Sequence, residues 1–162
     1  MATQVDGTPV GLRCSAIVIR NNEVLLVHRE VSDDWVLPGG APEQGEGSGA
    51  CVRREVREET GLNVDPTAVA FVYETIDPDR QDRTIDIVLY AEEPDRPAPI
   101  KCEPGLTPSF VAFDDLALID LRPPIAGYLR GAVRSHPQRS APYLGNLWRS
   151  PAAVRKQPPG PT

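Results

Sequence analysis

The sequence lacks the long apolar segments that mark a membrane protein. No apolar run in its 162 residues approaches the length of a membrane span. The first nine residues also lack the basic start and the apolar stretch of a secretory signal peptide. We therefore expect a soluble protein of the cytoplasm that has no membrane partner.

Cysteine is also scarce. Only Cys14, Cys51 and Cys102 are present, and no C-x-x-C pair occurs. Three cysteines cannot all pair with one another, so a disulfide framework is not expected. Free thiols in a reducing compartment are the simplest interpretation.

An excess of positive charge is absent too. The formal net charge of −6 argues against broad binding to nucleic acid or to anionic membranes. An enzyme with this charge that acts on an anionic substrate needs local cations, from a bound metal or from arginines beside its pocket. The length and the 40% apolar content indicate one globular domain with its own core.

What the sequence does contain is a series of short strand patterns. Strands are predicted over 12–20, 23–29, 35–37, 68–75, 84–91 and 109–113. Asn21-Asn22 predicts a turn between the first two strands, because asparagine tolerates left-handed backbone. In the strand over 84–91, Ile85, Ile87 and Leu89 alternate with more polar positions, so that face is expected to be the buried one.

Two helices are predicted. The first covers 48–60, with Ser48 as its N-cap and Gly61 as the residue that stops it. The second begins with Pro123 or Pro124 in its first turn and places Ile125, Leu129 and Val133 on one face. Strands on both sides of the first helix, with the second helix late in the chain, predict an α/β sandwich with a mixed β-sheet.

The ends of the chain are predicted to differ from this domain. Residues 1–10 are expected to form a flexible leader, and 11–136 to form the domain. The tail over 137–149 is apolar enough to dock on the domain, whereas 150–162 is expected to be a proline-rich disordered tail. The span 94–108 holds five prolines and is expected to be a connecting loop.

The first helix carries an unusual group of charges. At about 100° per residue, Glu55, Glu58 and Glu59 share one narrow face. Like charges at this spacing destabilise a helix by on the order of a few tenths of a kcal/mol each. A solvated surface is the ordinary explanation of a glutamate-rich helix. The alternative is that a hard divalent cation such as Mg²⁺ or Mn²⁺ compensates the charge, because such ions prefer oxygen ligands.

The residues around this helix fit the pattern G-x5-E-x7-R-E-U-x-E-E-x-G-U, in which U is a bulky aliphatic residue. The matching positions are Gly40, Glu46, Arg54, Glu55, Val56, Glu58, Glu59, Gly61 and Leu62. On these residues the chain resembles the Nudix hydrolase superfamily, in particular its MutT-like and ADP-ribose pyrophosphatase-like members. The resemblance implies the Nudix α/β/α sandwich, with the signature as a catalytic loop–helix–loop on one edge of the pocket.

The resemblance also implies a chemistry and a set of metal ligands. Water attacks phosphorus in a nucleoside diphosphate linked to a group X, and a P–O–P bond breaks. Mg²⁺ is the expected cofactor, with Mn²⁺ as an alternative. The expected metal ligands are Glu55, Glu58, Glu59 and the carbonyl group of Gly39.

Further roles follow from the same resemblance. Glu55 and Glu58 are expected to be catalytic, and Glu58 is a candidate general base. Arg54 is expected to orient the glutamates through an ion pair with Glu46. Gly40 is expected to let the backbone approach the substrate closely.

Other functional residues are expected outside the signature. Relatives use a further acidic residue in the loop before the late strand, for which Glu103 is the first candidate and Glu92 and Glu93 come next. Arg29 and Arg83 are candidates for binding substrate phosphate. The alternative for each is an ordinary loop or surface residue.

The substrate is left open at this point. Pro78, sixteen residues after Leu62, is a spacing seen in ADP-ribose pyrophosphatases of the family. Nucleoside triphosphates, dinucleoside polyphosphates and non-nucleotide diphosphates are alternatives. Two rivals are a non-catalytic nucleotide-binding regulatory domain and an isopentenyl diphosphate isomerase, which shares the fold and needs a reactive cysteine. A homodimer is a further expectation from the resemblance.

Overall fold

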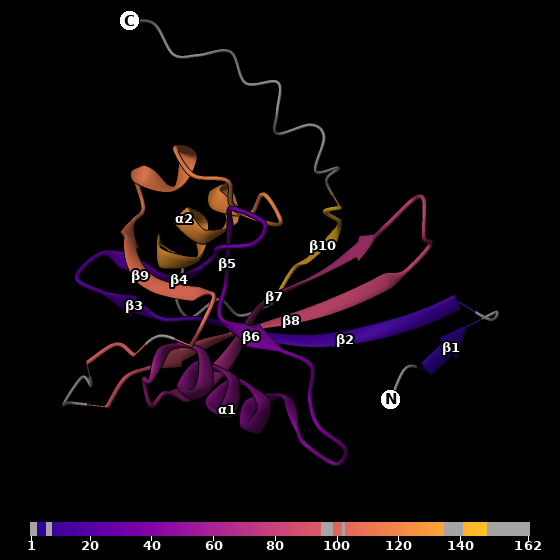
Figure 1. The fold of residues 1–162 in the computed structure, drawn as a ribbon, viewed down its shortest axis with the longest axis horizontal. Helices are drawn as coiled ribbons and strands as arrows, with labels where there is room; N and C mark the ends of the chain where they lie inside the picture. The colour runs from indigo at the N-terminus through magenta and orange to yellow at the C-terminus, as the bar shows by residue number, and fades with distance from the viewer. Residues whose placement is uncertain (1–2, 6–7, 95–98, 102, 135–140, 149–162) are drawn as a thin grey trace, which may run out of the picture.

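The computed structural model describes residues 3–5, 8–94, 99–101, 103–134 and 141–148 (Figure 1). Its centre is a six-stranded sheet in the order β1-β2-β8-β7-β10, with β6 paired to β2. The strands are β1 (Thr3–Val5), β2 (Thr8–Ile17), β6 (Gly39–Gly40), β7 (Asp65–Ile76), β8 (Arg83–Glu92) and β10 (Tyr143–Asn146). β2 is parallel to β8 and β7 is antiparallel to it, so the sheet is mixed, as predicted.

A four-stranded second sheet continues the fold. It contains β3 (Ile19–Arg20), β4 (Glu23–Arg29), β5 (Asp34–Val36) and β9 (Leu106–Ala112). The predicted turn between β3 and β4 is confirmed, since Asn21 and Asn22 have φ angles of 50° and 63°.

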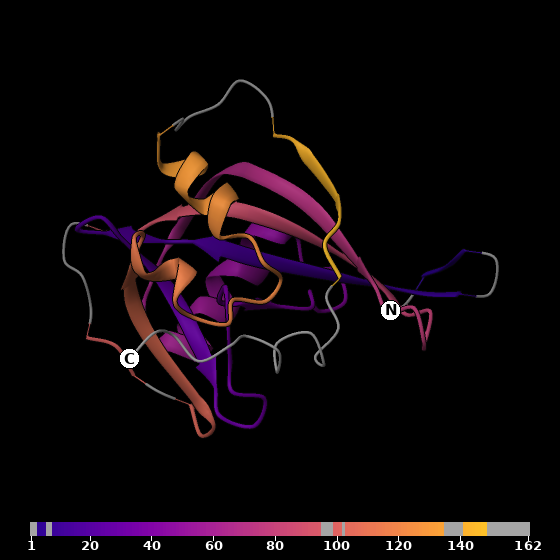
Figure 2. The ribbon, with the colours of Figure 1, turned by 90° about the horizontal axis from the view of Figure 1, so that it is seen from above.

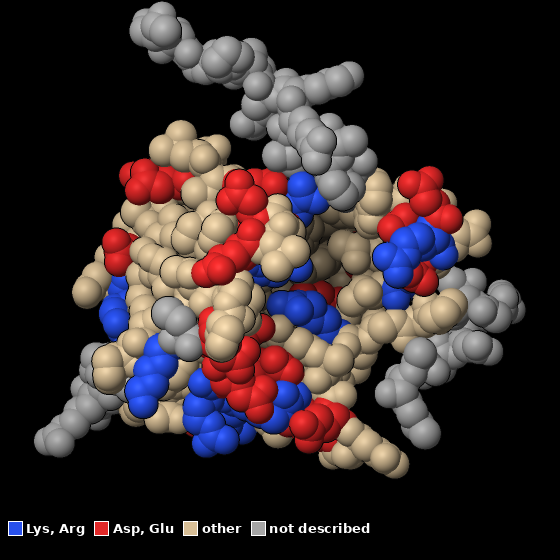
Figure 3. All heavy atoms as spheres, viewed as in Figure 1, with Lys and Arg blue, Asp and Glu red and all other residues tan. Residues whose placement is uncertain are grey.

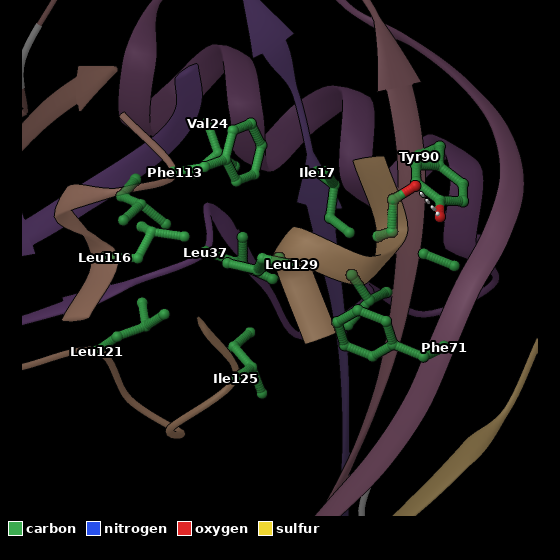
Figure 4. Close-up of a cluster of buried hydrophobic side chains, with 14 of the residues drawn as sticks. Ile17, Val24, Leu37, Phe71, Tyr90, Phe113, Leu116, Leu121, Ile125 and Leu129 are labelled. Atoms are coloured by element: carbon green, nitrogen blue, oxygen red, sulfur yellow. Dashed lines mark hydrogen bonds between the residues drawn. The ribbon is translucent and has the colours of Figure 1, made fainter. Parts of the chain in front are cut away.

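The two helices lie on opposite sides of the sheets (Figure 1). From α1 (Ser48–Thr60), Val52 and Val56 are buried in a cluster with alternate residues of β2. From α2 (Ala126–Arg134), Leu129 is buried in a second cluster, which Ile125, just before the helix, and Ile17 and Phe71 also join (Figure 4). Between them in the chain lies a short 3-10 helix, η1 (Asp115–Ala117). The layers are therefore helix, sheet, helix, which confirms the predicted α/β sandwich.

This layering corrects the prediction for β8. Residues of both faces are buried: Leu89 packs toward α1, whereas Val88 and Tyr90 pack toward α2. Alternation of apolar and polar residues marks a strand with one solvated face, but a strand covered by helices on both faces has none.

The helix ends also differ in detail from the prediction. The N-cap of α1 is Gly47, which makes no side-chain cap hydrogen bond, and Ser48 is the first helical residue. The predicted stop is confirmed: Gly61 is left-handed, with φ of 75°, and its N–H donates to the Arg57 carbonyl. The second helix begins at Ala126, after the two prolines rather than at them.

Two segments expected to be irregular form strands. The described part of the expected leader is a hairpin in which Thr3–Val5 pairs with residues 8–10 at the start of β2. The last three residues of the expected loop over 94–108 belong to a strand, because β9 begins at Leu106 and pairs with β4. β9 lies at the edge of its sheet, where Pro108 is tolerated because its missing N–H need not serve a neighbouring strand.

The described part of the tail docks on the sheet. β10 runs parallel to β7 along the sheet edge (Figure 2). Leu144 and Leu147 pack against the core cluster under α2, and the Leu147 N–H donates to the Glu74 carbonyl. The expected disordered tail over 150–162 lies outside the described residues, as does the side chain of Val133.

Neither helix in the described part of the chain is long and apolar enough to cross a membrane.

Candidate active site

The carboxylates of α1 pack directly on the backbone of β6. The Gly39 N–H donates to Glu59 Oε2 at 3.0 Å. A Cβ atom on Gly40 would lie 2.5 Å from the Glu55 carboxyl, and one on Gly39 would lie 2.2 Å from the Cys14 carbonyl oxygen. Gly39 therefore needs glycine, because a side chain there would displace the backbone of β2, whereas a side chain at Gly40 would displace the Glu55 carboxylate.

Arg54 ties the loop before α1 to the helix. Its Nε and Nη2 donate to the two oxygens of Glu46 at 3.0 and 2.8 Å, so the expected ion pair is present and is bidentate. Its Nη1 donates to Glu55 at 2.7 Å and to Glu58 at 3.2 Å. The hydrogen bonds from Arg54 lower the pKa of Glu46 to about 2.

Glu59 lies in an environment that disfavours its charged form. Burial is the main reason that its pKa is raised to about 7, and the nearby charges of Glu55 and Glu103 raise it further. The Gly39 hydrogen bond and the positive charge of Arg13 act in the opposite direction. Glu103 is therefore within electrostatic reach of Glu59, although its own side chain is exposed.

The two other candidates for the extra acidic residue differ in their contacts. Glu93 accepts hydrogen bonds from the Arg20 guanidinium, which stacks on the Phe110 ring. Glu92 ends β8 and is exposed. Among the three acids, Glu103 is the one whose charge acts on Glu59.

The site fits a hard divalent cation in its chemistry. Within the described residues, no three Asp, Glu, His or Cys side chains are already grouped as metal ligands, and Arg54 holds Glu55 and Glu58. However, the charges of Glu55 and Glu103 add to burial in raising the pKa of Glu59, and a bound cation would offset this repulsion. Glu55, Glu59 and Glu103 are the oxygen donors suited to this, whereas the described contact of Gly39 with α1 is made by its N–H.

A cavity of about 230 Å³ lies next to β2, the strand that pairs with β6. Its lining comes from β2, β4, β5, the link from β5 to β6, β7, β8 and the segment before α2: Arg13, Ser15, Arg29, Val36, Leu37, Tyr73, Thr75, Thr84, Asp86, Arg122, Pro123 and Ile125. Ser15 connects the two regions, because it is the partner of Gly39 in the pairing of β2 with β6. Figure 3 shows a hollow with basic and acidic side chains on the same face as the charged cluster over α1.

One wall of the cavity is a buried acid. Asp86 is 1% exposed. Its Oδ2 accepts hydrogen bonds from Ser15 Oγ at 2.8 Å and from the Tyr73 hydroxyl at 2.6 Å, and Arg13 Nε lies 3.4 Å away. Burial raises the pKa of Asp86, against the effects of Arg13, Tyr73 and Ser15. Its other oxygen, Oδ1, is buried without a hydrogen-bond partner.

A second wall carries two arginines around Asp34, which is also buried. Arg29, predicted to bind substrate, lines the cavity and donates two hydrogen bonds of 2.6 Å to Asp34. Arg122 lies 3.4 Å from the same carboxylate. The Arg122 N–H donates to the Trp35 carbonyl, and this hydrogen bond holds the segment before α2 against β5.

Arg83, the other arginine predicted to bind substrate, lies outside the cavity lining. Its Nη1 donates to Glu74 at 2.8 Å. Thr84 and Asp86 line the cavity, and side chains of a strand alternate between its faces, so Arg83 points to the other side.

Four residues of the cavity wall were not predicted from the sequence: Arg13, Arg122, Tyr73 and Asp86. An arginine or tyrosine within a strand pattern gives no local signal of function. The one available signal was Asp86, a charged residue inside an otherwise apolar strand.

Two larger hollows lie elsewhere. One of about 380 Å³ is lined by outward residues of α1, including Arg53 and Arg57, and one of about 430 Å³ lies between residues 11–12 and 41–45. None of the three is lined by Glu55, Glu59 or Glu103. The cavity beside Ser15 is connected to the carboxylates by the pairing of Ser15 with Gly39 and by Arg13, whose charge acts on Glu59.

Comparisons with known proteins show the family and the fold of this chain. The family model described as the NUDIX domain matches residues 11–131. A MutT protein from Methanosarcina mazei Go1 is 24% identical, with a TM-score of 0.66 over 81% of this chain and 98% of that one. A NUDIX hydrolase from Nitrosomonas europaea is 18% identical, with a TM-score of 0.67 over 77% and 88%. An ADP-ribose pyrophosphatase from Streptococcus suis 89-1591 is 19% identical, with a TM-score of 0.60 over 82% and 98%.

Proposed function

This chain belongs to the Nudix hydrolase family of pyrophosphohydrolases, and we propose that it hydrolyses the diphosphate linkage of a nucleoside diphosphate joined to a second group, with Mg²⁺ as cofactor. The observation that carries this proposal is the packing of Glu55 and Glu59 on the backbone of the glycine pair. The small-molecule diphosphate is the expected partner, and the net charge of −6 disfavours nucleic acid.

We assign separate roles in the reaction to the glutamates. One water is consumed: its oxygen bonds to phosphorus, the bridging P–O bond breaks, and its proton passes to a carboxylate. We assign that carboxylate to Glu58 or Glu103, and the holding of Mg²⁺ to Glu55, Glu59 and Glu103. When bound, Mg²⁺ supplies neutralisation of phosphate charge and lowers the pKa of water.

Arg54 and Arg13 support this chemistry in different ways. Arg54 fixes Glu55 and the loop at Glu46 with directed hydrogen bonds, which keeps the carboxylates in one arrangement. Arg13 lines the cavity, and its charge lowers the pKa values of both Asp86 and Glu59. We propose that Arg13 binds the phosphate that is attached to the group held in the cavity.

The cavity bears on the choice of substrate. A volume of about 230 Å³ is below the roughly 300–1,000 Å³ of pockets that hold a whole drug-sized ligand. It suits one base or one sugar rather than a complete dinucleotide. Pro78 gives no added support for ADP-ribose, because it is exposed in the turn between β7 and β8 and does not line the cavity.

The rivals fit less well. An isomerase needs a reactive cysteine, but Cys14 and Cys51 are fully buried, and burial is the main reason that the pKa of the Cys51 thiol is raised to about 12. A regulatory domain has no need of the full set of signature glutamates. A non-nucleotide diphosphate remains the second candidate for the substrate, because the cavity lining includes the apolar Val36, Leu37 and Ile125.

The test is a panel of nucleoside triphosphates, nucleotide sugars and prenyl diphosphates with Mg²⁺, with products identified by mass. The expected result is release of a nucleoside monophosphate or of phosphate from at least one nucleotide, and its loss when Mg²⁺ is chelated. Turnover of prenyl diphosphates alone would replace the nucleotide proposal, and binding without turnover would favour the regulatory domain. Sedimentation of the same preparation tests the expected homodimer.

A further inference from the structure

Two arginines of the cavity wall meet at one buried acid. Arg29 ends β4 and donates two hydrogen bonds to Asp34, its partner in the pairing of β4 with β5. Arg122, from the segment before α2, lies 3.4 Å from the same carboxylate and donates to Asp120. Ser32 donates a further hydrogen bond to Asp34. The shared carboxylate therefore holds both guanidinium groups in a fixed orientation.

The two arginines are open to a ligand, whereas this carboxylate is closed. The side chains of Arg29 and Arg122 are 43% and 19% exposed, and both residues line the cavity. The Asp34 side chain is 3% exposed, and Asp34 is not part of the lining. Basic side chains are visible in the hollow (Figure 3). A ligand that enters the cavity therefore meets the two cations and not the acid that holds them.

The other acids near the wall do not cancel this positive charge. Asp86 lines the cavity, but its side chain is 1% exposed, and burial raises the pKa of Asp86, which favours its neutral form. Asp120, the second partner of Arg122, lies outside the lining. The Arg13 side chain, in contrast, is 31% exposed. Among the described residues of the lining, the charged groups that a ligand can reach are therefore three guanidinium groups.

Arg29 and Arg122 also retain unused hydrogen-bond donors. A guanidinium group has five N–H donors and no acceptor. In both residues the side-chain hydrogen bonds are made by Nε and Nη2, and Nη1 has no hydrogen-bond partner among the described residues. The matching ligand group is therefore one that accepts hydrogen bonds. A carboxylate or a phosphate fits best, because its charge also offsets the two cations.

We propose that Arg29 and Arg122 together form an anion site, which binds a carboxylate or a phosphate carried by the group X of the substrate. The inference rests on the proposed function, in which Arg13 binds the phosphate attached to the group in the cavity. It narrows the substrate class to diphosphates whose group X is itself charged, such as a sugar acid or a sugar phosphate. Neutral sugars and prenyl diphosphates are disfavoured, because neither supplies a second anion to the two arginines.

The test compares matched ligands that differ by one anionic group. One pair is UDP-glucuronate and UDP-glucose, in which a carboxylate takes the place of a hydroxymethyl group. The other pair is ADP-ribose and its derivative with a phosphate on the terminal ribose. For each ligand, Kd is measured by calorimetry with Ca²⁺, and kcat/KM is measured with Mg²⁺. The pair that responds tells a carboxylate from a phosphate.

The variants separate charge from packing at Arg122. Arg122→Gln removes the charge and Arg122→Lys keeps it, and in both Asp34 retains its two hydrogen bonds from Arg29, so the fold should hold. Arg53→Gln, at an exposed arginine on the outer side of α1, is the matched control. The wild type should bind the anionic member of at least one pair about 10-fold or more tightly, the factor expected of hydrogen bonds to charged groups. Arg122→Gln should lose most of this preference, Arg122→Lys should keep part of it, and Arg53→Gln should keep all of it.

A wild type that binds neither anionic ligand more tightly than its neutral partner would overturn the inference. So would an unchanged preference in Arg122→Gln, or an equal loss of affinity for both members of a pair, because Arg122 would then bind a part that the two ligands share. Any of these results with normal turnover leaves the hydrolase proposal standing. Conversely, a binding preference that depends on Arg122, in a protein that hydrolyses no diphosphate, would sustain the inference and remove the hydrolase.

Discussion

The Glu55 carboxylate lies over Gly40 so closely that a Cβ atom there would be 2.5 Å from it. The backbone of β6 and the acidic face of α1 therefore share one small space. The position of the carboxylates is set by the absence of a side chain on the strand as much as by the helix that carries them.

Gly40→Ala tests this relationship. The added methyl group should push Glu55 aside, and because displacements of about 1 Å cost on the order of 100-fold in rate, kcat/KM should fall by about that factor. The fold should remain, as judged by circular dichroism. Gly127→Ala is the control: nothing lies near its Cβ in α2, so it should stabilise the protein by about 0.5–1 kcal/mol and leave kcat/KM unchanged.

Glu59→Gln tests the metal site with two measurements. Partners that only orient metal ligands cost about 10–100-fold when removed, so loss of a ligand should lower turnover by more than about 100-fold. Wild-type protein should gain about 2.7 kcal/mol in unfolding free energy at a free Mg²⁺ concentration 100 times Kd, and the variant should gain much less. Near-normal turnover, or an unchanged response to Mg²⁺, would refute the assignment.

Arg54→Lys tests the role of the guanidinium fork. A lysine ammonium cannot hold both oxygens of Glu46 and still reach Glu55. We expect kcat/KM to fall by about 10–100-fold with little change in KM. Arg57→Lys, on the exposed side of the same helix, should behave like the wild type. A matching loss in both variants would mean that helix stability, and not the fork, is responsible.

Asp34→Asn should alter the dependence of stability on pH. Burial by itself raises the pKa of Asp34, but hydrogen bonds from Arg29 and Ser32 and the charges of Arg29 and Arg122 lower it below its ordinary value. A lowered native pKa gives stability that is present above the ordinary value near 3.8 and is lost as pH falls through the native value.

Denaturant unfolding at pH 6 and at pH 3 measures this effect. The variant should be less stable than the wild type by about 2–3 kcal/mol at pH 6, and the difference should shrink at pH 3. Asp33→Asn, next to it and 92% exposed at the side chain, should be nearly neutral at both. A difference for Asp34→Asn that is the same at both pH values would contradict the ion pair as the cause.

Two truncations test the tail. Removal of residues 150–162 should leave activity and stability unchanged. Removal of 141–162 strips β10 and the partly buried Leu144 and Leu147 from β7. That should cost on the order of 2 kcal/mol or more and lower Tm by about 4 °C or more. A large loss from the shorter truncation would show that those residues serve the site or an interface.

Part of the site could be predicted because its residues are close in sequence. Glu55, Glu58 and Glu59 share a face as soon as a helix forms, since helical geometry fixes their spacing. Arg54 and Glu46 are likewise separated by only a loop and one turn. The sequence alone therefore determined the family, the acidic helix face and the ion pair that supports it.

The tertiary structure decided the cavity. Ser15 and Asp86 are 71 positions apart and meet because β2 pairs with β8 in one register. A shift of one residue in that register would turn Asp86 to the other face and bring Ile85 or Ile87 into its place. Such contacts depend on long-range strand pairing and on the burial of both faces of the sheet, neither of which is written in any local pattern of residues.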